Sequence, residues 1–252
     1  MTFKSFLCSL TLVFLLTAGS ALAASQNYIN GIDANYPPHA FVDKTGKPSG
    51  FDVESMDWIA NKMGFTVEHR PMDWDGIVPS LLAKKIDMVC SGMSISPERQ
   101  KLVTFSDPYW TVRKYLLVLQ DSKLTKDDLI KGKKVLGVQA GTNEAETLKA
   151  MFDKGEANFT LKFYESPPLA IEDLVNGRID GAAIDSAPAD EAMNKGKKPI
   201  KVVGDFAEPD SFGVATRNED TELREKINKG YELLKQDPYW EELKAKYINP
   251  AQ

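Results

Sequence analysis

The strongest constraint on the fold is a pattern that occurs twice along the chain. Short apolar segments typical of strands alternate with segments whose apolar residues recur at helical spacing, first over residues 28–92 and again over 133–204. In each series the third strand carries an Ile-Asp pair followed by small or apolar residues, at Ile86-Asp87 and Ile179-Asp180. Alternating strands and helices build layered α/β structures with largely parallel sheets. The sequence therefore predicts two α/β lobes of similar construction.

Two further apolar segments lie where the chain would pass between these lobes, near residues 111–118 and 206–216. We expect both to be strands that cross from one lobe to the other and form a hinge. Two helices are predicted after the second crossing, and they would return to the first lobe. This gives lobe 1 as residues 24–112 and 213–252, and lobe 2 as residues 113–212.

The first 23 residues have the three-part organisation of a secretory signal peptide. Lys4 precedes an apolar run from about Phe6 to Leu16, and the segment ends in Ala21-Leu22-Ala23. The run is too short to span a bilayer as a permanent helix. We expect cleavage after Ala23, export to the periplasm, and no insertion into the membrane.

Composition argues against several classes of function. The net charge of −5 disfavours nucleic acid as a partner, because its recognition needs clustered Lys and Arg. The two histidines, His39 and His69, have no second ligand at metal-binding spacing, and no nucleotide-binding glycine motif occurs. We expect no metal and no cofactor. Cys90 follows an apolar run and is expected to be a buried, inert thiol.

The segment CSGMSISPERQK, at the end of the first series, has the composition of an anion site. Ser96 is a good helix N-cap, which places Arg99 in the first helical turn. Backbone N–H groups at a helix start, the hydroxyls of Ser91 and Ser94, and a guanidinium group all favour an anion. Gly92 would let a ligand approach the backbone. The simpler interpretation is a capped helix with Arg99 in solvent.

A second set of candidates lies where strands of either series end. Asp185 ends the strand of the second series, and ligands of open α/β sheets bind at such carboxyl ends. Asp33 follows the first strand and would face the same cleft, while Tyr36 and Trp74 could form its walls. The alternatives are a helix N-cap for Asp185, a turn aspartate for Asp33, and core packing for the aromatic side chains.

Four blocks of this sequence resemble the family 3 solute-binding proteins, the bacterial periplasmic receptors for polar amino acids. The blocks are GFDVESMDWIANKMG, MDWDGIVPSLLAKKIDMVCSGMSISPERQKLVTFSDPYW, GKKVLGVQAGT and LVNGRIDGAAIDSAP. They occur in order along the chain that follows the signal peptide. The resemblance implies the two-lobed, type II periplasmic-binding-protein fold, with the lobes joined by two hinge strands.

The resemblance also implies roles for individual residues. In the family a first-lobe arginine and nearby backbone and hydroxyl groups bind the ligand α-carboxylate, and a second-lobe aspartate binds the α-ammonium. The carboxylate-binding role would fall on Arg99 with Ser91, Gly92 and Ser94, and the ammonium-binding role on Asp185. The family also has contacts from a second-lobe loop, here Thr142 and Asn143, and an aromatic pair that packs on the ligand, here Tyr36 and Trp74. Asp33 matches the family position that meets the ligand side chain.

Some positions depart from the family pattern. Ser96-Pro97 stands where threonine and a polar residue are usual, Gln139 where some relatives have lysine, and Asn143 where others have glycine or glutamine. These departures leave the identity of the amino acid open. Asp33 favours a polar or basic ligand.

The resemblance therefore implies a monomeric receptor that delivers a free amino acid to an inner-membrane ABC permease, without catalytic residues. Two alternatives stay open. One is an exported enzyme like cyclohexadienyl dehydratase, in which Glu144 would be the candidate general acid. The other is a ligand-binding input to a membrane sensor.

The signal-peptide interpretation makes a direct prediction. Protein recovered from the periplasm of an expressing Gram-negative cell should begin at Ala24, as read by N-terminal sequencing or intact mass. Retention of residues 1–23 on the recovered protein would contradict it.

Overall fold

Two five-stranded sheets, one from each half of the chain, are the framework of the computed structural model, which describes residues 26–248. The predicted signal peptide lies outside the described residues. The strands of the first sheet, in spatial order, are β5 (Thr66–Pro71), β1 (Asn27–Ile32), β6 (Met88–Val89), β13 (Ala215–Thr216) and β7 (Thr104–Phe105). Those of the second are β10 (Phe159–Tyr164), β9 (Lys134–Gln139), β11 (Gly181–Asp185), β8 (Trp110–Leu119) and β12 (Ile200–Phe212).

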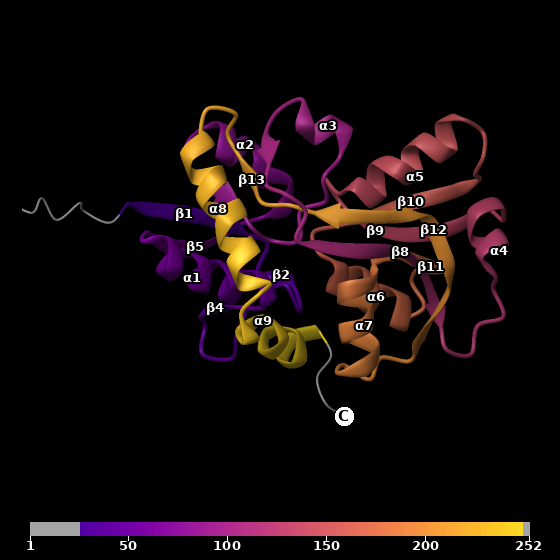
Figure 1. Cartoon of the computed structure of the whole chain (residues 1–252). Coiled ribbons are helices and arrows are strands. Elements are labelled where there is room, and N and C mark those ends of the chain that lie inside the picture. Colours follow the sequence, from indigo (N-terminus) through magenta and orange to yellow (C-terminus); the bar gives the residue numbers. More distant parts are fainter. Residues whose placement is uncertain (1–25, 249–252) are drawn as a thin grey trace, which may run out of the picture.

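The two sheets share one plan, which confirms the predicted two-lobed α/β fold. In each sheet three strands run parallel, with the first strand of the series between the second and the third. An antiparallel strand then joins the third one, β13 beside β6 and β8 beside β11. The lobes lie side by side, and β8 and β12 run together out of the second lobe toward the first (Figure 1).

Helices cover both sheets. Around the first sheet lie α1 (Phe51–Met63), η1 (Trp74–Gly76), α2 (Ile77–Leu82), α3 (Pro97–Gln100), α8 (Thr221–Leu234), α9 (Pro238–Leu243) and η2 (Lys244–Ile248), with the short strands β2 (Asn35–Tyr36), β3 (Ala40–Val42) and β4 (Pro48–Ser49). Around the second lie α4 (Lys126–Lys131), α5 (Asn143–Asp153), α6 (Pro167–Val175) and α7 (Ser186–Asn194). None of the helices within residues 26–248 is long and apolar enough to cross a membrane.

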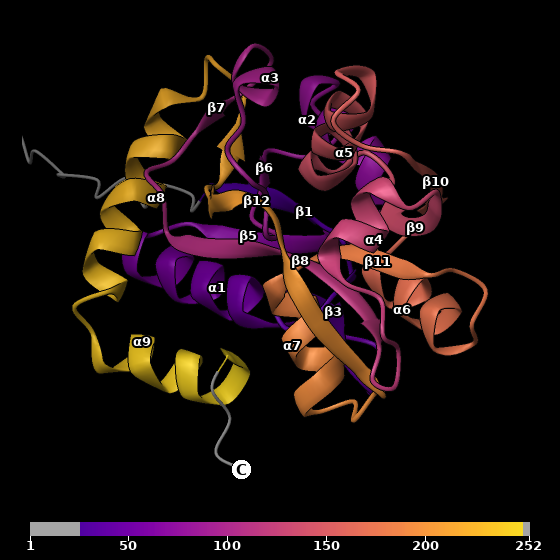
Figure 2. The same ribbon diagram turned by 90° about the vertical axis from the view of Figure 1, so that its right-hand side faces the viewer.

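The C-terminal helices return to the first lobe, as predicted. Helix α8 lies along α1, and α9 lies beside the end of the pair in both views (Figures 1 and 2). Gly230 of α8 faces Ile59 of α1 so closely that a Cβ at Gly230 would come within 2.3 Å of the Ile59 side chain. The absence of a side chain at Gly230 therefore permits the close contact between the two helices.

The hinge strand β12 differs from the sequence prediction. The second strand–helix series was expected to end at residue 204, before a separate crossing strand near 206–216, but Ile200–Phe212 is one strand of 13 residues. Its pairing with β8 shifts register between Val202 and Gly204 and twice more before Asp210. Such bulges keep a bent strand paired while it changes direction, which explains the apparent break in the sequence pattern. The division of the lobes at residues 112/113 and 212/213 stays a prediction.

Candidate functional site

A cavity of about 260 Å³ lies between the two lobes, at the carboxyl ends of β6, β9 and β11. Eight of the ten predicted site residues line it. The lining consists of Tyr36, Trp74, Ser91, Gly92, Ser94, Arg99, Gln139, Thr142, Glu144 and Asp185. Asp33 and Asn143 are the two predicted residues outside this lining.

The first-lobe wall is fixed by a buried aspartate of α1. Asp52 Oδ2 accepts hydrogen bonds from the Gly92 N–H at 2.6 Å and the Tyr109 hydroxyl at 2.7 Å, while its Oδ1 lies 2.9 Å from His39 Nδ1. Gly92 has a φ of +59°, and a Cβ there would lie 2.5 Å from the Tyr36 ring. The site thus needs glycine at this position, both for the backbone angle and for the approach of Tyr36.

Arg99 extends from the first turn of α3 toward the second lobe. Ser96 caps this helix by accepting a hydrogen bond from the Arg99 N–H, which confirms the predicted cap. The guanidinium group donates to the Ser94 carbonyl at 2.9 Å and to the Gly141 carbonyl across the cleft at 3.3 Å. It also lies over the Trp74 ring, 5.3 Å from its centroid. Arg99 therefore lines the inner cavity and is not free in solvent.

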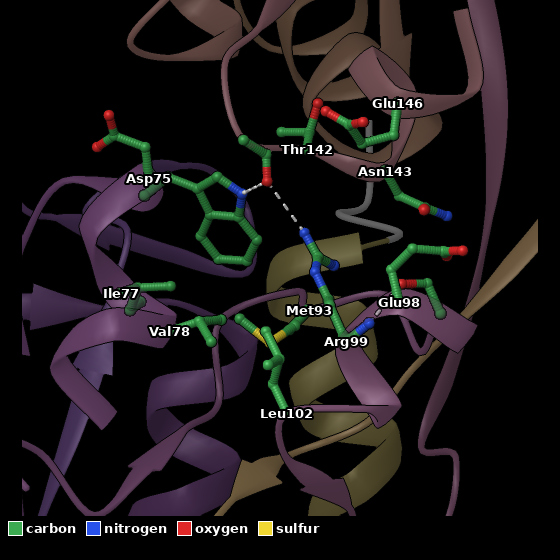
Figure 3. Close-up of a pocket in the computed structure, with 13 residues that line it drawn as sticks. Asp75, Ile77, Val78, Met93, Glu98, Arg99, Leu102, Thr142, Asn143 and Glu146 are labelled. Atoms are coloured by element: carbon green, nitrogen blue, oxygen red, sulfur yellow. Dashed lines mark hydrogen bonds between the residues drawn. The ribbon is translucent and has the colours of Figure 1, made fainter. Parts of the chain in front are cut away.

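A second pocket, of about 680 Å³, lies on the outer side of Arg99. Its floor is apolar, formed by Ile77, Val78, Met93 and Leu102, and acidic side chains of both lobes stand at its edge (Figure 3). The Gly141 carbonyl receives hydrogen bonds from both the Trp74 indole and Arg99 (Figure 3). Trp74 and Arg99 line both cavities, so they form the wall between the inner cavity and this outer pocket.

Asp185 lies at the end of β11 and faces the inner cavity. It occupies the N-cap position of α7 but makes no side-chain cap, so the alternative interpretation of this aspartate is wrong. Its Oδ2 accepts a 2.6 Å hydrogen bond from the Tyr36 hydroxyl of the first lobe, and its Oδ1 lies 3.0 Å from Lys114 Nζ. The carboxyl group thus connects the two lobes.

The loop after β9 contributes less through side chains than expected. The Thr142 hydroxyl caps α5 by accepting from the Ala145 N–H, and it donates to the Gln139 carbonyl at 2.8 Å. Asn143 donates to Asp210 of the hinge strand at 2.6 Å and lines the outer pocket. These two side chains hold the loop and the start of α5 in place.

Asp33 follows β1 and is buried behind the cavity. Its backbone N–H donates to Ser91 Oγ, and its Oδ2 accepts a 2.7 Å hydrogen bond from the Gln139 amide of the second lobe. Burial raises the pKa of Asp33, and the hydrogen bond from Gln139 opposes that rise. A ligand side chain that reached Asp33 would have to take the place of Gln139.

Two further residues belong to this end of the site: Glu144, which the sequence indicated only as a candidate general acid, and Lys114, which it did not indicate. Glu144 lines the cavity beside Asp185, and Lys114 of β8 is buried behind both carboxyl groups, with an exposed fraction of 1%. Val112, Lys114 and Leu116 alternate along β8 and are all buried, so Lys114 stands at an inward-facing position. A lysine at such a position in an apolar strand is the signal that could have indicated it.

The carboxyl groups beside Lys114 have opposite pKa shifts. Burial and the nearby Glu144 raise the pKa of Asp185 to about 8, despite the opposing effect of Lys114. Burial acts on Glu144 in the same direction, but the ammonium group of Lys114 outweighs it and lowers the pKa of Glu144 to about 2. At neutral pH Glu144 is therefore ionised, whereas Asp185 retains a proton in much of the ligand-free protein.

Fold and site together define a class of protein: two lobes that close on a small polar cavity with oppositely charged ends. A model of the bacterial extracellular solute-binding proteins, family 3, matches residues 28–250. The chain belongs to this family.

Individual relatives agree with this assignment. The putative ABC transporter arginine-binding protein 2 of Escherichia coli (strain K12) is 34% identical over 243 residues, 94% of this chain and 98% of that protein. An ancestral arginine-binding protein bound to arginine has a TM-score of 0.79 and 34% identity, over 88% of this chain and 98% of its own. The ancestral amino acid-binding protein AncCDT-1, a precursor of cyclohexadienyl dehydratase, also has a TM-score of 0.79 and 34% identity. The match covers 88% of this chain and 95% of that one.

The raised pKa of Asp185 predicts how the stability of the ligand-free protein depends on pH. The folded state keeps this proton up to about pH 8, whereas the unfolded chain loses it near pH 4, so Asp185 makes the free energy of unfolding fall as the pH rises between these values. Asp185→Asn removes the effect. In urea denaturation from pH 5 to pH 8, the stability difference between the variant and the wild type should shift steadily in favour of the variant; parallel profiles would contradict the shifted pKa.

Proposed function

We propose that this protein is a periplasmic receptor that binds a free α-amino acid in the inner cavity and presents it to an ABC permease. The observation that carries the proposal is the placement of opposite charges on one small closed cavity. Arg99 of the first lobe and the carboxyl groups of Asp185 and Glu144 in the second line the same space. A buried zwitterion is tolerated where both of its charges are paired and hydrogen-bonded, and these groups supply both partners.

The proposed binding mode follows the two charges. The α-carboxylate of the ligand pairs with Arg99 and with Ser94, which lines the same cavity, and Tyr36 and Trp74 pack on the ligand. The Gly92 N–H already donates to Asp52, so Gly92 contributes by leaving room for the close approach. The α-ammonium pairs with Asp185, which loses its proton on binding. Thr142 contributes through the backbone at the start of α5, because its hydroxyl group already donates to Gln139.

The balance of charge around the cavity favours a cationic amino acid. Four acidic side chains, Asp33, Glu144, Asp185 and Asp210, surround the site, whereas Arg99 and Lys114 are its cations. A ligand with net charge +1 reduces this imbalance, whereas a dicarboxylic amino acid increases it. Relatives described as binding arginine agree with this preference.

An enzyme on the same scaffold is the second candidate. Glu144 does not suit the role of general acid, because Lys114 holds it ionised. Asp185, with a pKa of about 8, does carry a proton at neutral pH, as a general acid must. Conversion of prephenate or arogenate by the purified protein would support the enzyme, and stable binding of an unreacted amino acid would support the receptor.

The receptor proposal predicts ligand-dependent stability. After unfolding, removal of co-purified ligand and refolding, a screen against the common amino acids should raise the melting temperature most for arginine, lysine or ornithine. Binding to the folded state alone stabilises it by about 4 kcal/mol when the ligand is at a thousandfold excess over Kd. No shift with any α-amino acid would contradict the proposed function.

Arg99→Ala should weaken the binding of the amino acid identified in that screen by roughly 30-fold to several thousandfold, because it leaves a buried carboxylate without its partner. Calorimetric titration measures the loss. Arg70→Ala is the matched control, since Arg70 is an exposed first-lobe arginine paired with Glu68. Unchanged affinity in Arg99→Ala would refute the role of Arg99 in binding the carboxylate.

A separate experiment identifies the membrane protein to which the ligand-loaded receptor binds. An ABC permease should be captured by the ligand-loaded protein in a pull-down from membranes of the source bacterium; capture of a membrane sensor in its place would support the signalling alternative.

A further inference from the structure

Lys114 is the most completely buried cation of the site, and it has no role in the binding mode described above. Its Nζ atom lies 3.0 Å from Asp185 Oδ1 and 2.7 Å from Asp210 Oδ2, and it also donates to Glu144 Oε1. An ammonium group has three N–H donors. All three are therefore engaged by carboxylates of the protein, and Lys114 has no donor left for a ligand carboxylate.

The three carboxylates come from three different elements. Glu144 is in the first turn of α5, Asp185 ends β11, and Asp210 lies in the hinge strand β12. Lys114 itself lies in the other hinge strand, β8. Asp210 also accepts the hydrogen bond from Asn143. Lys114 thus connects both hinge strands to the two elements that carry the acidic end of the cavity.

Lys114 lies behind the cavity wall, whereas two of its partners form that wall. Asp185 and Glu144 line the inner cavity, and Lys114 does not. Any effect of Lys114 on a ligand must therefore pass through these two carboxyl groups.

The charge of Lys114 also affects the ionisation of the carboxyl groups beside it. Two carboxyl groups that share a buried site cannot both be ionised without a compensating cation. Burial alone would lower the pKa of Lys114, but Asp185, Glu144 and Asp210 outweigh it and raise that pKa above its usual value. Lys114 consequently stays charged. The remaining groups that face Asp185 are the Tyr36 hydroxyl and, more distantly, Arg99.

We propose that Glu144 is a second acceptor, beside Asp185, for the ammonium group of the ligand, and that Lys114 is a positioning residue whose charge lets both carboxylates face that single ammonium group. The inference rests on the proposed function, because it takes the ligand to be an α-amino acid. It assigns the acidic end of the cavity to a primary ammonium group that donates to both carboxylates.

Replacing Lys114 tests the positioning role. Lys114→Met keeps most of the side-chain volume and removes the charge, so Asp185 should hold its proton more firmly and the affinity for L-arginine at pH 7 should fall at least tenfold. At pH 8 Lys114→Met should release more protons on ligand binding than the wild type, because without the lysine more of the carboxyl groups are protonated before the ligand binds. Titration calorimetry in two buffers of different ionisation enthalpy measures both quantities.

Three further variants separate charge from packing. Lys114→Arg keeps the charge and should keep the wild-type proton release. The double variant Lys114→Met with Glu144→Gln removes opposite charges together and should bind more tightly than Lys114→Met alone. Lys201→Met replaces a half-buried lysine elsewhere in β12, opposite Val118, and should change neither quantity. A Lys114→Met protein with wild-type affinity and proton release would overturn the positioning role.

Glu144 is tested with variants that keep Lys114. Glu144→Gln should weaken binding of L-arginine about tenfold, as expected for the loss of a hydrogen bond between charged groups, but should not weaken binding of 5-guanidinovalerate, which is arginine without its α-ammonium group. Equal weakening for both ligands, or for neither, would overturn the assignment of Glu144. If wild-type protein binds no α-amino acid, the proposed function itself fails; if it binds normally and these variants behave as wild type, this inference alone fails.

Discussion

The ammonium group of Lys114 contacts two buried carboxyl groups, those of Glu144 and Asp185, and the partly exposed carboxylate of Asp210, and the second-lobe half of the site depends on these contacts. Without a cation, Glu144 and Asp185 could not both be ionised in a place with so little access to water. With Lys114 in place, Glu144 is ionised and Asp185 has a raised pKa. Asp185 can then lose its proton when the ammonium group of a ligand binds beside it. The same lysine lies in the hinge strand β8, so it links the acidic end of the cavity to the connection between the lobes.

The first-lobe half is built differently, from backbone and neutral donors held by a single aspartate. Asp52 of α1 accepts hydrogen bonds from the Gly92 N–H and the Tyr109 hydroxyl, and these bonds fix the loop that precedes α3. Ser96 then caps α3 and places Arg99 over Trp74. Direct contacts between the lobes, from Tyr36 to Asp185 and from Arg99 and Trp74 to Gly141, close the cavity around its charges. The cavity lining therefore has the guanidinium group of Arg99 on the first-lobe side and the carboxyl groups of Asp185 and Glu144 on the second-lobe side, as a receptor for a zwitterion requires.

Much of this arrangement could be predicted from the sequence, and the limits have physical reasons. The duplicated strand–helix pattern predicted the two sheets, and the serine-rich segment before Arg99 predicted a capped helix, because both depend on local periodicity and capping. Lys114 was missed because its partners lie 30, 71 and 96 positions further along the chain, and no local pattern reports such contacts. The engagement of Thr142 and Asn143 by the protein itself was missed for the same reason. The continuous strand β12 was divided because its bulges interrupt the period-two pattern.

A structure of the protein with a bound cationic α-amino acid would show how the two lobes divide the charges of the ligand. We expect the ligand carboxylate within hydrogen-bonding distance of the Arg99 guanidinium group, and the ligand ammonium group between the carboxylates of Asp185 and Glu144, with Lys114 still behind them. A ligand in the reverse orientation, or one held in the outer pocket on the far side of Arg99, would contradict this arrangement.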